Sequence, residues 1–109
     1  MDARLYDDVL QFTECIKDTP EYREYQEKKR DLENHPELLE KVEILRKKNF
    51  EMSSAINEDR DSLSGVIRFA DENEDIIMEP VVHDFMMAEA AFCGMMREIL
   101  SMTMEQIDL

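Results

Sequence analysis

The chain is poor in glycine, proline and cysteine. Its 109 residues include two glycines, three prolines and two cysteines. So few turn-forming residues argue against a β-sandwich or a β-barrel. Cys15 and Cys93 form no CxxC pair, so the sequence predicts neither a disulfide framework nor a zinc knuckle. A length of 109 residues is typical of one domain, and we expect a single all-α domain over residues 1–109.

Long hydrophobic runs and an excess of positive charge are also absent. No run approaches about 18 apolar residues and the N-terminus has no signal-peptide pattern, so we expect a cytoplasmic protein without membrane insertion. Thirteen Lys and Arg against 27 Asp and Glu give a formal net charge of −14. A surface this negative repels phosphate backbones, and we expect no direct nucleic-acid binding.

Apolar residues recur at helical spacing in the first half of the chain. Leu5, Val9, Phe12 and Ile16 predict a helix from Asp2 to about Lys17. Thr19-Pro20 predicts the start of a second helix, because the hydroxyl can cap it and proline suits its first position. Asn34-His35-Pro36 predicts the end of that helix and the start of a third, with His35 in the cap.

A longer pattern follows. Steps of four and three run from Leu38 to Ala70, and serine and glycine within 59–65 predict a bend or break there. The acidic run 71–75 predicts the connection to the last helix, because close like charges disfavour a helix. The heptad spacing from Val81 to Met102 predicts the last helix over 80–106.

These segments predict an antiparallel helical bundle of four or five helices, two of them long. The segment from Val81 to Met102 alone would span about 32 Å. The first two helices are too short to cover both long helices, so part of the apolar surface is left for another chain. We therefore expect a homodimer.

Several segments together carry a resemblance to a known family: residues 19–25, 34–38 and 45–50, and Ala88-Glu89 ahead of 96–99. In order and spacing they resemble the YlbF/YmcA family. The resemblance implies a small helical bacterial protein, a non-enzymatic adaptor in a complex that affects competence, sporulation and biofilm formation. It also implies a link to messenger-RNA processing through the endoribonuclease called ribonuclease Y. Some members with extra C-terminal cysteines are associated with an iron–sulfur cluster, but the last nine residues here contain no cysteine.

Two possible metal sites lack the ligands that they would need. The run 71–75 places oxygen ligands as an EF-hand loop does, but Ile76 replaces the glycine of the turn and Val82 the closing glutamate. His83 has Glu79 one helical turn earlier, a single pair typical of a surface ion pair. We expect no metal and no cofactor.

Catalytic residues are not evident either. Cys15 and Cys93 lie in helical patterns with no glycine-rich turn nearby, and we expect both to be small buried apolar residues. The sequence therefore predicts that the protein is not an enzyme.

Methionine is concentrated in the final third, which holds seven of the nine. A wide methionine-rich helical face suits a protein interface, although a central helix buried all round fits the same pattern. We predict that the second subunit or a partner protein binds around Phe85, Met86, Met96 and Met102.

The basic residues suggest an alternative. Eight of the thirteen lie within 23–48, including Lys28-Lys29-Arg30 and Arg46-Lys47-Lys48. This segment could bind a nucleic acid or another anion. Acidic residues are interleaved with it, which favours ordinary pairing one helical turn apart on a solvated surface.

Overall fold

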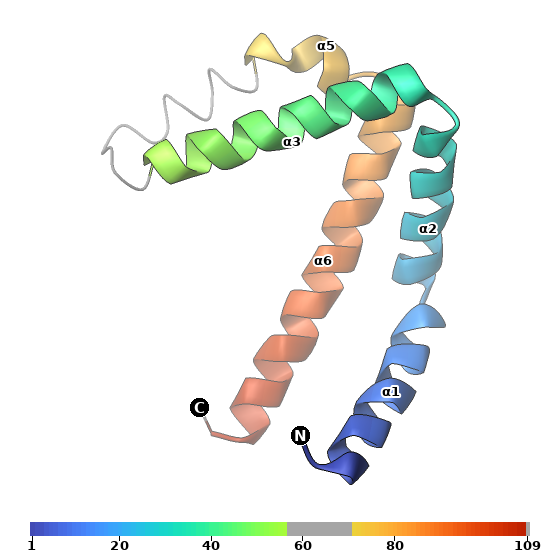
Figure 1. Ribbon diagram of the computed structural model, residues 1–109, viewed down its shortest axis with the longest axis vertical. Coiled ribbons are helices and arrows are strands. Elements are labelled where there is room, and N and C mark those ends of the chain that lie inside the picture. Colours follow the sequence, from blue (N-terminus) through green and yellow to red (C-terminus); the bar gives the residue numbers. More distant parts are fainter. Residues whose placement is uncertain (57–70, 109) are drawn as a thin grey trace. The chain divides into compact units, whose positions relative to one another are not determined.

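The structure, a computed structural model, describes residues 1–56 and 71–108 (Figure 1). Within these ranges it contains five helices and no strand, which confirms the all-α prediction. The helices are α1 (Ala3–Lys17), α2 (Pro20–Glu33), α3 (Pro36–Ile56), α5 (Glu74–Ile77) and α6 (Pro80–Gln106). The bend predicted within 59–65 lies outside the described residues.

Local capping explains why the predicted helix boundaries are correct. The Asp2 carboxylate accepts hydrogen bonds from the backbone N–H groups of Arg4 at 2.7 Å and Leu5 at 3.2 Å, which satisfies two donors at the start of α1. The His35 carbonyl accepts from the N–H groups of Leu38 and Leu39 at 3.0 and 2.9 Å. His35 therefore belongs to the start of α3, as predicted.

The acidic run is not the simple connection that its charge predicted. Asp71 and Glu72 are helical, and Glu74 and Asp75 form the first turn of α5. Negative side chains are favourable in a first turn because the N-terminal end of a helix carries a partial positive charge. Repulsion within the run is therefore offset by the position of Glu74 and Asp75 in α5.

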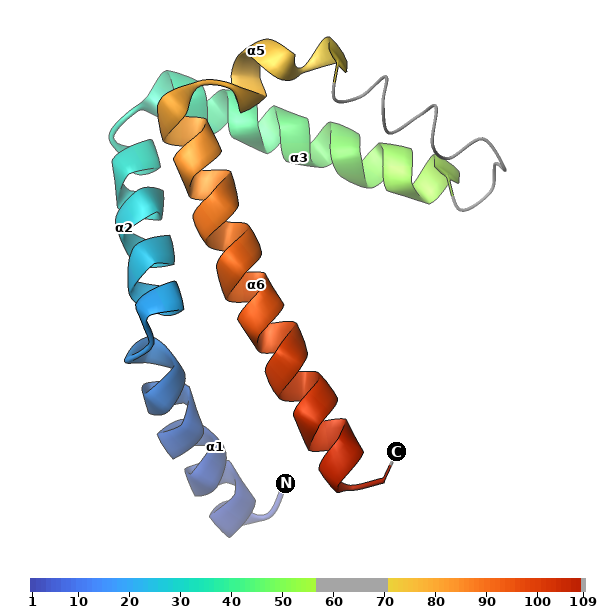
Figure 2. The ribbon, with the colours of Figure 1, turned by 180° about the vertical axis from the view of Figure 1, so that it is seen from behind.

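The described chain divides into two compact units, which we describe separately. The first unit comprises Met1–Lys29 and Phe85–Leu109, and the second comprises Arg30–Asp84. In the first unit, α1 and α2 lead in one direction and α6 returns antiparallel to them (Figures 1 and 2). That the whole chain is one domain stays a prediction.

Aromatic rings form the core of the first unit. The Tyr25 ring stacks on Phe92 with centroids 5.2 Å apart and an interplanar angle of 12°, and it also meets Phe85 at 5.9 Å. Tyr22 meets the same Phe92 ring at 5.7 Å. Phe85 and Ala88 are buried. These contacts join α2 to the first half of α6, with Tyr22 and Tyr25 on the inner face of α2.

Aliphatic side chains form the core of the second unit. Leu32, Val42 and Leu45 are buried there, the last two at the predicted steps of four and three from Leu38, and α3 packs against α5. Val82 is fully buried, although the heptad pattern placed its neighbour Val81 on the inner face. Asn73, which precedes α5, is buried as well. The sequence patterns identified the aliphatic core but missed Val82 and Asn73.

Candidate functional site

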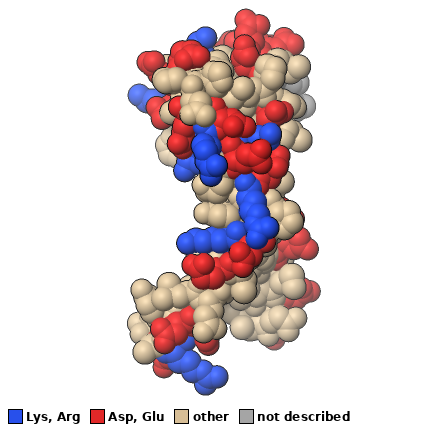
Figure 3. All heavy atoms as spheres, turned by 90° about the vertical axis from the view of Figure 1, so that its right-hand side faces the viewer, with Lys and Arg blue, Asp and Glu red and all other residues tan. Residues whose placement is uncertain are grey.

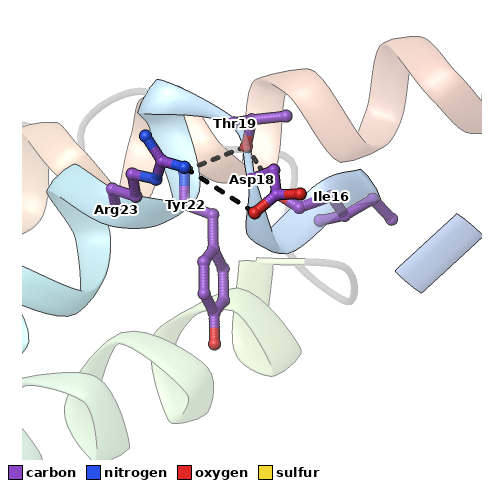
Figure 4. Close-up of polar contacts among 5 residues, drawn as sticks. All are labelled: Ile16, Asp18, Thr19, Tyr22 and Arg23. Atoms are coloured by element: carbon purple, nitrogen blue, oxygen red, sulfur yellow. Dashed lines mark hydrogen bonds and ion pairs between the residues drawn. The ribbon is translucent and has the colours of Figure 1, made fainter. Parts of the chain in front are cut away.

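The joint between α1 and α2 is held by one threonine (Figure 4). The Thr19 hydroxyl donates to the Ile16 carbonyl at 2.6 Å and accepts from the Tyr22 N–H at 3.3 Å. The Arg23 guanidinium lies 3.6 Å from the Asp18 carboxylate across the same joint. Thr19 thus bonds to the last turn of α1 and the first turn of α2, so the direction in which α1 leaves α2 is fixed locally.

α1 buries none of its residues, although its sequence is amphipathic. The apolar side chains spread over about 160° of the helix surface, counting 100° per residue. Each is between 43 and 55% exposed. We call this set the α1 face: Leu5, Tyr6, Val9, Leu10 and Phe12.

The second half of α6 is equally uncovered. Ala88 is the last buried residue of α6, and the residues from Glu89 to Gln106 are all exposed or half-buried. Met96, Leu100 and Met104 lie in one row at spacings of four, and Met102 lies on the heptad row. Met102 is two residues from both Leu100 and Met104, so it lies on the other side of the helix. We call Met96, Leu100 and Met104, which are 36 to 60% exposed, the α6 face.

The structure places the four predicted interface residues differently from one another. Met96 is 36% exposed and belongs to the α6 face, whereas Met102 is 56% exposed and lies on the other side of α6. Met86 is half-buried, and Phe85 is buried against Tyr25, where it contributes to the core of the first unit. The prediction did not include Leu100, Met104 or the α1 face. The spacing of four from Met96 could have pointed to Leu100 and Met104.

No enclosed cavity accompanies these faces in the described chain. A depression of about 480 Å³ runs along α6 and is lined by Arg97, Leu100, Ser101, Met104 and Glu105. All five residues belong to a single helix. Small-molecule sites are concave and are lined from several sides, so this depression is part of an open helical surface.

Basic side chains alternate with acidic ones on the face drawn in Figure 3. Lys28 lies 4.0 Å from Glu24 one helical turn earlier, and Arg23 pairs with Asp18. These pairs favour the interpretation of residues 23–48 as a solvated surface over that of an anion site. The lower part of Figure 3, where α1 lies, is mostly uncharged.

The cysteines differ from the prediction. Both thiols are free and exposed, so the expectation that Cys15 and Cys93 are buried apolar residues is wrong. Cys15 lies in α1, which buries no residue, and Cys93 lies in α6 beyond its last buried residue. Among the described residues, no group of three or more His, Cys, Asp or Glu is placed to hold a metal ion.

The described residues therefore define an all-α protein whose main surface features are two uncovered apolar helix faces. The chain matches the family model described as control of competence regulator ComK, YlbF/YmcA, over residues 5–108. It belongs to the YlbF/YmcA family, a family of regulators. Searches of curated proteins and of solved structures each found no match to this chain.

A membrane-spanning role finds no support among the described helices. None of them combines the length and the apolar character needed to cross a bilayer.

Proposed function

We propose that this protein is a non-enzymatic regulator that acts through protein–protein contacts. Two copies associate through the α1 and α6 faces, and the dimer binds the other proteins of a bacterial complex that influences RNA processing and developmental regulation. The observation that carries this proposal is that α1 buries no residue and that α6 buries none beyond Ala88.

The cost of leaving these faces in water supports the proposal. A 15-residue helix is marginally stable by itself, so α1 needs tertiary contacts. The eight side chains of the two faces are each 36 to 60% exposed. Together they offer on the order of 800 Å² of apolar surface, about what each partner buries in an interface of standard size.

A second copy fits this surface better than a small ligand does. In a twofold dimer each copy presents the same patch, so both exposed faces of one chain are covered by the equivalent faces of its partner. Two antiparallel helices from each copy would complete a four-helix arrangement around one shared core. A homodimer would thus cover both faces with one interface.

The charge balance favours protein contacts over RNA contacts in the proposed complex. With a formal net charge of −14, the chain repels phosphate backbones at long range. Arg23 and Lys28, which belong to the basic segment, are paired with acidic side chains. A role in RNA processing would therefore be exerted through a partner protein that handles the RNA.

Self-association is tested by mixing tagged and untagged copies of the full chain. Leu100→Lys places an ammonium group on the α6 face, while Met87→Lys places one on α6 outside that face. Leu100 and Met87 are each 60% exposed, so neither substitution should prevent folding. We expect tagged wild type to retain the untagged wild type and the untagged Met87→Lys variant, and to lose Leu100→Lys. Equal retention of both variants would place the interface elsewhere.

The same two variants test the regulatory role. Proteins of the bacterial complex should be captured by the wild type and by Met87→Lys, with weaker capture by Leu100→Lys if partners need the dimer. RNA binding is measured in parallel over a range of salt concentrations. Tight RNA binding that falls steeply with salt would favour the alternative function of residues 23–48 and contradict the proposal.

A further inference from the structure

We propose that the exposed face of α3 is a docking site for an acidic segment of a partner protein, one that carries apolar side chains beside its carboxylates. This inference rests on the proposed function, because it states the chemistry of a partner that the regulator binds. The face lies in the second unit. We call it the α3 face, and it consists of Lys41, Ile44, Lys47, Lys48 and Phe50.

Two large apolar side chains of α3 lie outside the core of the second unit. Val42 and Leu45 are buried, whereas Ile44 is 48% exposed. Phe50 is 73% exposed. Ile44, Lys47 and Phe50 follow one another at spacings of three, so the amine lies between the two apolar side chains on the helix surface. The α3 face therefore combines apolar area with positive charge.

Positive charge gathers on this face although the chain as a whole is strongly acidic. Residues 41–50 contain four basic residues and one acidic residue, in a chain of formal net charge −14. Ile44 has one lysine three residues before it and two lysines three and four residues after it. Side chains at these spacings are neighbours on a helix, so three amines lie around one exposed aliphatic side chain.

The lysines of the α3 face are not balanced by acidic side chains within the described chain. Arg23 and Lys28 on α2 are paired with carboxylates. Among the described residues, no ion pair joins the three lysines of the α3 face to a carboxylate, although Glu43 lies one helical turn before Lys47. The pairing that favours a solvated surface around Arg23 and Lys28 therefore does not extend to α3.

An acidic segment with apolar side chains is complementary to both properties of the face. Its carboxylates would pair with the lysine amines, while its apolar side chains would cover Ile44 and Phe50. Excluding water from these pairs strengthens them, because charges interact more strongly at a lower dielectric constant. The area offered by one helix face is small, so we expect a transient contact.

RNA fits the α3 face less well. The ring of Phe50 could stack on a base, but the aliphatic side chain of Ile44 offers no stacking surface. An RNA strand also carries a phosphate at every nucleotide, and it would extend beyond the three amines over a chain of net charge −14. A short acidic segment places only its few carboxylates at the lysines.

The test measures the fluorescence anisotropy of a dye-labelled synthetic peptide while the full chain is added. The peptide consists of leucine and glutamate, with leucine at helical spacing, and we expect its binding to weaken when glutamine replaces glutamate. Lys47→Glu should raise the dissociation constant about tenfold or more, because it places a carboxylate between Ile44 and Phe50. Phe50→Ser should have an effect of similar size. Both positions are exposed, so neither substitution should prevent folding.

Lys29→Glu is the matched control. It makes the same change of charge at an exposed position of α2, outside the α3 face. Exposed charges that are distant from the bound peptide are screened by salt, so this variant should change the dissociation constant by about twofold at most.

Three results would overturn the inference. One is equal binding of the glutamate and glutamine peptides, or binding of neither, and another is an equal effect of Lys47→Glu and Lys29→Glu. The third is an oligouridylate probe that binds more tightly than the peptide and loses binding in Lys47→Glu, which would assign the face to RNA.

Sedimentation of the same variants separates this inference from the proposed dimer. Lys47→Glu should keep the oligomeric state of the wild type, because the α3 face is distinct from the α1 and α6 faces. A Lys47→Glu variant that is monomeric where the wild type is dimeric would assign the α3 face to the contact between copies and overturn the inference. A wild type that binds the peptide but never dimerises would contradict the proposed dimer alone, so the two failures are distinguishable.

Discussion

Thr19 shows how much of this structure depends on single polar groups at helix ends. Its hydroxyl contacts both Ile16 and Tyr22, whereas the Thr13 hydroxyl donates only to the Val9 carbonyl inside α1. We predict that Thr19→Ala lowers the free energy of unfolding by about 1 kcal/mol, because it removes a helix cap. The control Thr13→Ala should change it little, since alanine favours helix more than threonine does.

Urea unfolding of both variants measures the two changes in the free energy of unfolding. The protein concentration is kept fixed, because the stability of a dimer would depend on it. If both substitutions had equal effects, the Thr19 hydroxyl would not be acting as a cap.

Leu32 illustrates the other kind of residue-scale contribution, which is burial. It is 1% exposed in the second unit, while Ile44 on α3 in the same unit is 48% exposed. Leu32→Ala should cost about 2–5 kcal/mol, because it removes buried methyl groups and leaves a cavity. Ile44→Ala should cost less, because water already covers half of that side chain. Thermal unfolding of the two variants at equal concentration measures the difference, and similar losses would contradict the burial of Leu32.

At the scale of the element, α6 carries a glycine that the fold does not require. A methyl group added at Gly94 would lie 4.0 Å from the Arg97 side chain, which is ordinary van der Waals contact, and the backbone there is helical. Gly94→Ala should therefore raise the free energy of unfolding by about 0.5–1 kcal/mol, because alanine loses less backbone entropy in a helix.

The reverse substitution four residues earlier is the control. Ala90 is exposed on the same helix, so Ala90→Gly should lower stability by a similar amount. Urea unfolding of both variants measures the two changes. A destabilising Gly94→Ala would indicate that the backbone of α6 is closely approached there, in the dimer or by a partner.

α1 should be ordered by association rather than by the rest of its own chain. It buries no residue, whereas α2 is joined to α6 through Tyr22 and Tyr25. We predict that amide hydrogen exchange in α1 slows as protein concentration rises through the range of dimer formation, because in the proposed dimer a second copy covers the apolar face of α1. Exchange in α2 should change much less. Exchange rates in α1 that are independent of concentration would contradict this role.

The elements also show what the sequence could and could not predict. The starts of α1, α2, α3 and α6 were predictable because Asp2, Thr19, His35 and the prolines act locally. The short helix α5 was not predicted. Repulsion among the acidic side chains of 71–75 was considered, but the favourable interaction of such side chains with the N-terminal end of a helix was not.

The burial of individual side chains was less predictable, because it depends on contacts between distant segments. A heptad pattern selected Val81, whereas Val82 is the fully buried residue. Phe85 was assigned to the interface, but it packs on Tyr25 from another helix, a contact that no spacing within one helix reveals. The α1 pattern correctly predicted an amphipathic helix but not that its apolar side would stay uncovered within the chain.

At the scale of the whole molecule, the proposed regulation acts through assembly. The described residues present apolar helix faces and an excess of negative charge, and no enclosed cavity accompanies those faces. Such a surface suits selective contacts with proteins, because apolar side chains supply affinity while like charges discourage nucleic acids. The proposed dimer is the first of these contacts, and the others are proposed to depend on it.

Sedimentation equilibrium of the full chain tests this central claim most directly. The chain mass is 12.9 kDa, and at micromolar concentrations we predict a mass of twice that value, decreasing toward the single-chain mass on dilution. Leu10→Lys on the α1 face and Leu100→Lys on the α6 face should each shift the protein toward monomer, and Met87→Lys should not. A wild type that sediments at 12.9 kDa at every concentration up to the millimolar range would contradict the account.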